Sequence, residues 1–255
     1  MTTTVDVQQL EAKVKDMYRH VAAEPAGDYH FELGRPVAEH LGYPRDVLDR
    51  LPAQAIESFA GVGYFFDLAR LERGESVIDL GSGSGLDALF AAHEVGLDGR
   101  VVGVDFTVEQ LAKARRVAVE AGFSQVDLRE GRIEALPAEA EAFDCAISNG
   151  VINLAPDKDR VFGEAARVLR PGGRLAIADI VSEQQLKDSI VCDADLWASC
   201  IGGAAQQDAY RAAIEGAGLR IETLRENPYR FVSEQAQNAS EKYGVKSVAL
   251  LARKE

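Results

Sequence analysis

The chain has little cysteine and no long hydrophobic run, and each shortage excludes a class of protein. Its 255 residues include three cysteines, Cys145, Cys192 and Cys200, too few for a secreted domain held by disulfides. No apolar run approaches the roughly 20 residues that span a bilayer. The N-terminus, Met-Thr-Thr-Thr-Val-Asp, lacks the basic and apolar regions of a signal peptide. We therefore expect a cytoplasmic protein with no membrane partner.

Basic residues are scarce compared with acidic ones. The 28 Lys and Arg stand against 41 Asp and Glu, which gives a formal net charge of −13. The basic residues are scattered and usually neighbour acids, so the chain has no basic patch to overcome its repulsion of nucleic acid. We therefore expect no nucleic-acid partner. The sequence leaves the oligomeric state open.

The first 72 residues differ from the rest of the chain. From Val5 to His20 apolar residues recur at helical spacing among charges, which predicts an amphipathic helix. Glycines and prolines then punctuate an irregular segment that leads into the apolar stretch from Phe59 to Phe66. We expect residues 1–72 to form a helical cap or lid, with static cover of the core as the alternative. Residues 73–255 then form the main domain.

Beyond residue 73, short apolar runs alternate with helical patterns. This alternation predicts a parallel sheet covered on both faces, and the two last runs read as antiparallel edge strands. The fold class is α/β, a Rossmann-like, doubly wound and mostly parallel sheet of seven strands with an N-terminal helical cap. The predicted strands are Ser76–Leu80, Arg100–Asp105, Val126–Glu130, Phe143–Ser148, Arg174–Ile180, Arg220–Arg225 and Lys246–Leu251. The predicted helices are Leu86–Glu94, Val108–Glu120, Asp157–Leu169 and Gln207–Gly216.

A glycine-rich loop follows the first of these strands. After Asp79 the chain has Gly81, Gly83 and Gly85 at alternate positions and then begins a helix. Glycines let a backbone turn tightly against a ligand, and a helix N-terminus adds unpaired N–H groups. A dinucleotide-binding loop would have glycine or alanine where Leu86 stands. The spacing therefore favours a nucleoside ligand over a nicotinamide cofactor.

A second acid supports a nucleoside site. Asp105 ends the next predicted strand about 20 residues after the loop, where a carboxylate can accept hydrogen bonds from both ribose hydroxyls. A structural turn is the alternative for the loop alone, but loop and acid together favour a ligand. We expect it at the carboxyl ends of the strands, held by Asp79, Gly81, Ser82, Gly83, Gly85 and Asp105.

The loop, Asp105 and the segment Leu169-Arg170-Pro171-Gly172-Gly173 before a strand resemble class I S-adenosylmethionine-dependent methyltransferases. The resemblance covers roughly Glu75 to Leu251 and implies S-adenosylmethionine as cofactor. In that family the glycine loop wraps the methionine part, and the segment after the third strand flanks the adenine. Here that segment contains Arg132, where many members have an acid, and Ile133. We add Phe106, Tyr18 and Asn149 to the expected cofactor contacts.

Three further segments resemble the arsenite methyltransferase branch of this family. They run from Glu57 to Gly63, from Ser148 to Lys158 and from Asp195 to Ala204. In that branch cysteine thiolates, which are soft ligands, hold As(III). Of the three cysteine positions only Cys200 is a cysteine here, because Val62 or its neighbours occupy the first and Gly150 the second. We expect methyl transfer to a small-molecule acceptor, with arsenite and a non-catalytic cofactor-binding protein as alternatives.

The catalytic candidates follow from the chemistry of methyl transfer. Displacement at a sulfonium methyl needs an aligned acceptor, and a hydroxyl or amine acceptor also needs a base. His30 in the cap is the candidate base, whereas Asn149 and Asn153 at the end of the fourth strand can position cofactor and acceptor. Cys200 is the candidate thiolate. No set of residues predicts a resident metal ion.

Overall fold

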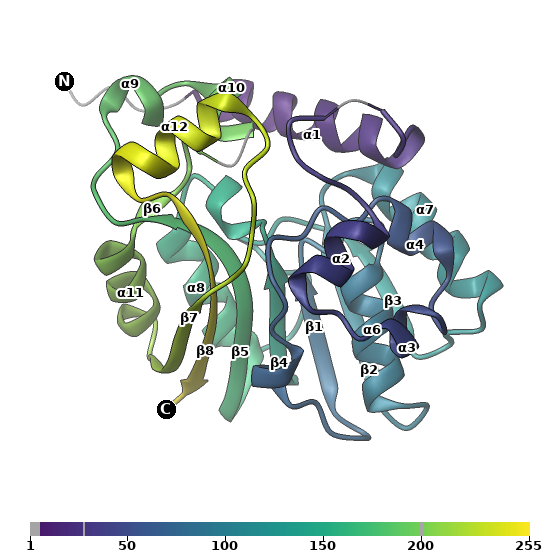
Figure 1. Cartoon of the computed structure of the whole chain (residues 1–255). Helices are drawn as coiled ribbons and strands as arrows, with labels where there is room; N and C mark the ends of the chain where they lie inside the picture. The colour runs from purple at the N-terminus through teal and green to yellow at the C-terminus, as the bar shows by residue number, and fades with distance from the viewer. Residues whose placement is uncertain (1–5, 28, 199–200) are drawn as a thin grey trace.

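The computed structural model describes residues 6–27, 29–198 and 201–255, and its centre is one mixed sheet (Figure 1). The strand order is β3-β2-β1-β4-β5-β8-β7, with β6 paired to the end of β5. The strands are β1 (Ser76–Leu80), β2 (Arg100–Asp105), β3 (Val126–Glu130), β4 (Phe143–Asn149), β5 (Leu169–Ser182), β6 (Ala205–Gln206), β7 (Leu219–Glu226) and β8 (Lys246–Lys254).

The predicted topology is confirmed, with one added strand. β1 to β5 pair in parallel, whereas β8 is antiparallel to both β5 and β7. The two-residue strand β6 makes the sheet eight-stranded rather than seven-stranded. It was missed because two residues are too short to show a period in hydrophobicity. β5 also begins five residues before the predicted Arg174, at Leu169.

Helices cover both faces of the sheet, as a buried parallel sheet requires. Successive strand residues alternate between two hydrophobic cores, so that Val77 belongs to one and Ile78 to the other. The first core contains residues of α6 (Leu86–Val95) and α7 (Val108–Glu120), and the second contains residues of α8 (Lys158–Val168) and α11 (Gln207–Gly216). No helix of the described residues has the length and apolar character needed to cross a membrane.

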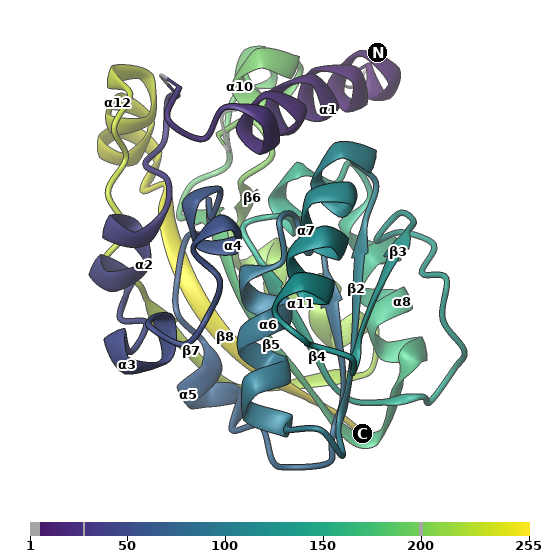
Figure 2. The same cartoon turned by 90° about the vertical axis from the view of Figure 1, so that its right-hand side faces the viewer.

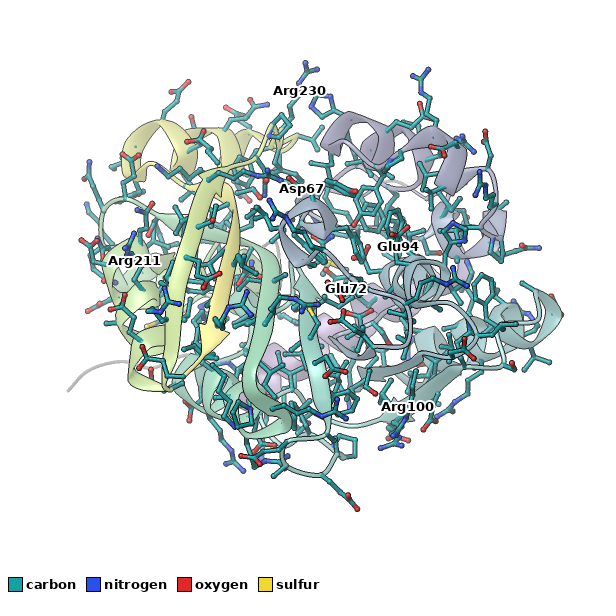
Figure 3. All side chains as sticks on the ribbon, turned by 90° about the horizontal axis from the view of Figure 1, so that it is seen from below. Asp67, Glu72, Glu94, Arg100, Arg211 and Arg230 are labelled. Atoms are coloured by element: carbon teal, nitrogen blue, oxygen red, sulfur yellow. The ribbon has the colours of Figure 1, made fainter. Side chains whose placement is uncertain are left out.

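The N-terminal helix α1 (Val7–Ala23) lies across the carboxyl ends of the parallel strands (Figures 1 and 2). Asp6 caps it by accepting hydrogen bonds from the backbone N–H groups of Gln8 and Gln9. The helix was predicted from Val5 to His20; it ends three residues later, and Val5 lies outside the described residues. Figure 3 shows the opposite end of the sheet, where Arg100 begins β2.

The other N-terminal elements are short helices, and further helical segments follow β4, β5 and β7. The short ones are α2 (Arg35–Leu41), α3 (Arg45–Leu48), α4 (Ala53–Glu57) and α5 (Phe66–Ala69). The others are η1 (Ile152–Leu154), α9 (Asp188–Val191), α10 (Ala194–Ala198) and α12 (Glu234–Tyr243). Leu10 and Val14 of α1 pack with Trp197 of α10 and Leu154 of η1 in a small third core. This core fastens one side of α1 to the main domain.

A buried lysine fastens the other side of α1. Lys113 of α7 has an 8% exposed side chain, and its ammonium group donates to the carbonyl oxygen of Ala22 at 3.3 Å. The same group donates to the Glu57 carboxylate and to the Ser58 hydroxyl, each at 2.7 Å. One cation therefore joins the end of α1 and the end of α4 to α7.

We expect Lys113→Met to lower the free energy of unfolding by about 1.5–3 kcal/mol, the usual range for hydrogen bonds to a charged group. The variant should also speed amide hydrogen exchange in α1, because Ala22 loses its tie to α7. Thermal unfolding and hydrogen-exchange mass spectrometry measure the two effects. Arg116→Met, on the exposed face of the same helix, is the control. If amide hydrogen exchange in α1 is the same in Lys113→Met as in the wild type, Lys113 does not hold α1 against α7.

Candidate functional site

A pocket of about 1060 Å³, its open mouth included, lies at the carboxyl ends of β1, β2 and β4. β1 and β4 are neighbours in the sheet, and the chain leaves them toward opposite faces, so ligands bind at such a position. Its lining includes Glu11, Tyr18, Asp79, Gly81, Ser82, Gly83, Asp87, Asp105, Phe106, Arg132, Ile133, Asn149 and Val151. Ten of the predicted site residues are therefore brought together.

The glycine loop is a tight turn at the floor of the pocket. The backbone N–H groups of Gly81 and Ser82 donate to the carbonyl oxygen of Val104 in β2, at 2.8 and 3.0 Å. Gly81 has φ +78°, and a Cβ there would lie 2.4 Å from the side chain of Val151. Gly83 has φ +51°, and a Cβ there would meet no atom within 4 Å. Glycine is thus needed at 81 for close packing, and Gly83 leaves room in the pocket for a ligand.

Asp105 holds the loop in place. One of its carboxylate oxygens accepts a hydrogen bond from the backbone N–H of Gly83 at 2.9 Å, and the other accepts from that of Thr107 at 2.8 Å. Its side chain is buried, and this burial raises its pKa, whereas the backbone hydrogen bonds oppose the rise. Each oxygen keeps a second lone pair, so the carboxylate can still accept from a ligand hydroxyl.

Two more buried carboxylates line the same pocket. The Asp79 side chain is 2% exposed, and its Oδ2 atom has no hydrogen-bond partner among the described residues. Burial and the charges of Asp87 and Asp105 raise the pKa of Asp79 well above its ordinary value. Burial likewise raises the pKa of Asp87 to about 6, although Asp87 accepts hydrogen bonds from Tyr43 at 2.5 Å and from Asn149 at 3.0 Å.

Asn149 binds protein groups on all sides. Its Oδ1 accepts from the backbone N–H groups of Val62 at 2.8 Å and Gly63 at 3.3 Å. Its Nδ2 lies within hydrogen-bond distance of the carbonyl oxygen of Gly63, the hydroxyl of Tyr43 and the carboxylate of Asp87. The amide therefore joins the segment that ends the N-terminal region to the start of α6, and it lines the pocket while doing so.

The other end of the pocket is bounded by groups suited to a flat ring. Ile133 and Phe106 line it, and Arg132 forms a two-pronged ion pair with Glu11 of α1, of which the Nη2–Oε2 distance is 2.6 Å. This pair raises the pKa of Arg132 and lowers that of Glu11. Tyr18 lines the same pocket from α1, and its carbonyl oxygen accepts from the Gln110 side chain at 2.9 Å.

Two predicted site residues, Gly85 and His30, do not line the pocket. Gly85 has φ +95° at the start of α6, and a Cβ there would lie 3.3 Å from that of Ala114 in α7. It therefore serves the packing of two helices. His30 lies edge-on against Phe31, with ring centroids 4.6 Å apart, outside the pocket wall. The sequence showed a histidine in the cap but not the direction of its ring.

Asn153 is also absent from the pocket wall, and Cys200 lies outside the described residues. Asn153 is fully buried in η1, where its N–H donates to the Asp179 carboxylate at 3.3 Å and its carbonyl accepts from Lys158 at 3.3 Å. It supports η1, whose Leu154 does line the pocket.

Sequence reasoning missed Asp87, Tyr43, Glu11 and Gln110. Asp87 stands two residues after the glycine loop, and its position in the first turn of a helix was the one available signal. Tyr43 reaches Asp87 across 44 residues, from a segment without regular periodicity. Glu11 of α1 and Gln110 of α7 are polar residues of predicted helices. They line the pocket together where α1 packs beside α7, and no pattern in the sequence shows that packing.

Comparisons with known proteins agree with this geometry. A family model described as a methyltransferase domain matches residues 71–218. The crystal structure of an arsenic(III) S-adenosylmethionine methyltransferase from Chlamydomonas reinhardtii superposes with a TM-score of 0.70 and 33% identity, covering 82% of this chain and 72% of that one.

Two curated relatives have the same activity in their names. The arsenite methyltransferase of Halobacterium salinarum is 39% identical over 199 residues, which are 77% of this chain and 51% of that protein. The human arsenite methyltransferase is 36% identical over 181 residues, 67% of this chain and 46% of that protein. The chain thus spans about half the length of the curated relatives it matches.

The raised pKa of Asp79 predicts that this residue costs stability. A carboxyl whose pKa is higher in the folded than in the unfolded protein stabilises the fold at low pH, and this contribution is lost as the pH rises through the folded value. We therefore expect Asp79→Asn to raise the melting temperature at pH 7.5, by about 2–4 °C for each kcal/mol recovered. The gain should shrink as the pH is lowered, because the wild-type carboxyl then takes up its proton. An equal or lower melting temperature at pH 7.5 would contradict it.

Proposed function

Because this chain belongs to the class I S-adenosylmethionine-dependent methyltransferases, we propose that it transfers a methyl group from S-adenosylmethionine to a small-molecule acceptor. The observation that carries the proposal is the pocket at the ends of β1, β2 and β4, with its glycine loop and three buried carboxylates. A non-catalytic binding protein would need the same cofactor pocket, so turnover has to separate the two.

The pocket residues fit S-adenosylmethionine. Gly83 leaves space above the loop, and Asp79 Oδ2 and Ser82 Oγ, which have no hydrogen-bond partner among the described residues, offer polar contacts to the methionine part. Asp105 can accept from the ribose hydroxyls, and Ile133 offers an apolar surface to the adenine. Three carboxylates near one end suit a ligand that carries positive charge.

When bound, S-adenosylmethionine supplies a methyl group on a positively charged sulfur. The protein's part is to bind, to align and to exclude water, which together can account for much of the acceleration of an in-line displacement. Asp105 and the loop hold the nucleoside at the sheet, while Asn149 holds the Gly61–Gly63 segment against the pocket. In this proposal α1 is the cap that covers the bound ligands, and residues 1–72 are the cap region.

Arsenite is the second candidate acceptor, favoured by the named activity of the relatives. The described part of the pocket does not supply soft ligands for it. A Cβ on Gly150 would lie 3.1 Å from the Val62 side chain, so the two positions that lack cysteine are neighbours filled by valine. Cys145 is buried in β4, and burial raises its pKa to about 12, which keeps it a thiol. An organic acceptor is therefore the better proposal.

We expect Asp105→Ala to weaken S-adenosylmethionine binding by about 1–3 kcal/mol, because ligand hydroxyls and the Gly83 N–H both lose an acceptor. Isothermal titration calorimetry measures the affinity, and circular dichroism verifies the fold. Asp127→Ala, on the exposed side of β3, is the control and should bind as the wild type does. Unchanged affinity in a folded Asp105→Ala protein, or tighter binding of NAD than of S-adenosylhomocysteine, would contradict the cofactor assignment.

We expect weak or absent methylation of arsenite by the wild-type protein, since Val62 and Gly150 offer no thiolate. The assay follows transfer of a labelled methyl group from S-adenosylmethionine to arsenite with a thiol present, and to a panel of small organic acceptors. Cys200→Ser should leave cofactor binding intact. Efficient arsenite methylation that Cys200→Ser abolishes would make arsenite the substrate, whereas no transfer to any acceptor would favour the binding protein.

A further inference from the structure

We propose that the buried carboxyls Asp79 and Asp87 together hold one proton, on Asp79, in the ligand-free protein, and that the positive charge on the methionine part of S-adenosylmethionine displaces it. The inference rests on the proposed function and deepens it, because it assigns Asp87 to the cofactor site and links binding to proton release. The proton passes from the carboxyl pair to the buffer, and no bond other than this O–H bond changes.

The geometry determines which of the two acids holds the proton. Asp87 accepts hydrogen bonds from the Tyr43 hydroxyl and the Asn149 amide, and both favour its ionised form. Asp79 is as deeply buried, and its Oδ2 has no such donor among the described residues. The proton therefore resides on Asp79, at the pocket wall where a ligand can replace it.

The part of the chain that the structure describes offers the pair no compensating cation. Among the described residues, the charges that act on Asp79 are those of Asp87 and Asp105, both negative. Asp105 is engaged by the backbone N–H groups of Gly83 and Thr107. Tyr43 faces Asp87 as a neutral donor, since burial raises its own pKa well above the ordinary value.

The basic group of the pocket lining is Arg132, and it is committed elsewhere. Its guanidinium is paired with the Glu11 carboxylate across the pocket mouth, and Glu134 lines the same end. Three carboxylates that come together in a buried site without a cation cannot all be ionised at low cost. A cationic ligand removes this cost and so should bind the deprotonated pair more tightly than the protonated one.

The direction of the pH effect follows from linkage. Below the pKa of the ligand-free pair the ligand must displace a proton, so its affinity falls by up to about tenfold for each unit of pH. Above that pKa the affinity levels off. Burial raises the pKa of Asp87 to about 6 and that of Asp79 well above its ordinary value, so the affinity should fall as the pH is lowered.

The experiment is calorimetric titration of the ligand-free protein with S-adenosylmethionine at several pH values from 5 to 7.5, in buffers of different ionisation enthalpy. We expect release approaching one proton per ligand near pH 5.5 and affinity at least tenfold weaker at pH 5 than at 7.5. The probe without charge is 5′-methylthioadenosine, the same nucleoside thioether without the amino acid part. Its affinity should change less than twofold.

Two variants separate the pair from other buried acids. Asp79→Asn should remove the proton release and flatten the pH dependence for S-adenosylmethionine. Asp179→Asn is the matched control: burial also raises the pKa of Asp179 to about 6, but this residue binds Tyr210 and lies outside the pocket. It should keep the full linkage.

The outcomes distinguish this inference from the function on which it rests. Measurable S-adenosylmethionine binding with no proton release and a flat pH profile overturns the shared proton but leaves the proposed function. Absence of S-adenosylmethionine binding at every pH overturns both. Proton release that persists in Asp79→Asn but disappears in Asp87→Asn would place the proton on Asp87 and overturn its assignment to Asp79.

Discussion

The hydrogen bonding of the glycine loop to the end of β2 is the constraint on which the rest of the site depends. Val104 accepts two N–H groups of the loop, and Asp105 accepts a third. These three bonds place the turn after β1 directly beside the end of β2, and so they determine where α6 begins. Asp87 in the first turn of α6 then faces Tyr43 and Asn149, and the cap region is tied to the sheet through them.

The fold was predictable because its signals are local and repeated. Each buried strand is a short apolar run, and glycine or proline punctuates the connections, so three of the seven predicted strands have the observed bounds. The loop and Asp105 were predictable for the same reason, since their spacing along the chain reflects one strand-turn-helix unit and the next strand. The strand β6 was missed, and the ends of β4, β5, β7 and β8 differ from the predicted ones, because pairing with a neighbour rather than residue pattern decides there.

The site was predictable within that unit and partly beyond it, since Tyr18, Phe106, Arg132 and Ile133 also line the pocket as expected. Asp79, Gly81 and Gly83 lie in the pocket as expected, but His30 turns to Phe31 and Asn153 supports η1. Asn149 lines the pocket as expected, and its hydrogen-bonding groups also contact the protein. These contacts join segments far apart in sequence, and side-chain direction in the irregular cap has no pattern that a single sequence can show.

The packing of Val62 against Gly150 restricts the substitutions that this pocket can accept during evolution. Gly150 has φ +71°, a conformation that residues with a side chain rarely adopt, and any Cβ there requires Val62 to move. A single substitution to cysteine at 150 therefore meets both backbone strain and a steric obstacle. The two positions are coupled, and a return to a thiol-lined pocket would have to pass through a less stable intermediate or change both residues together.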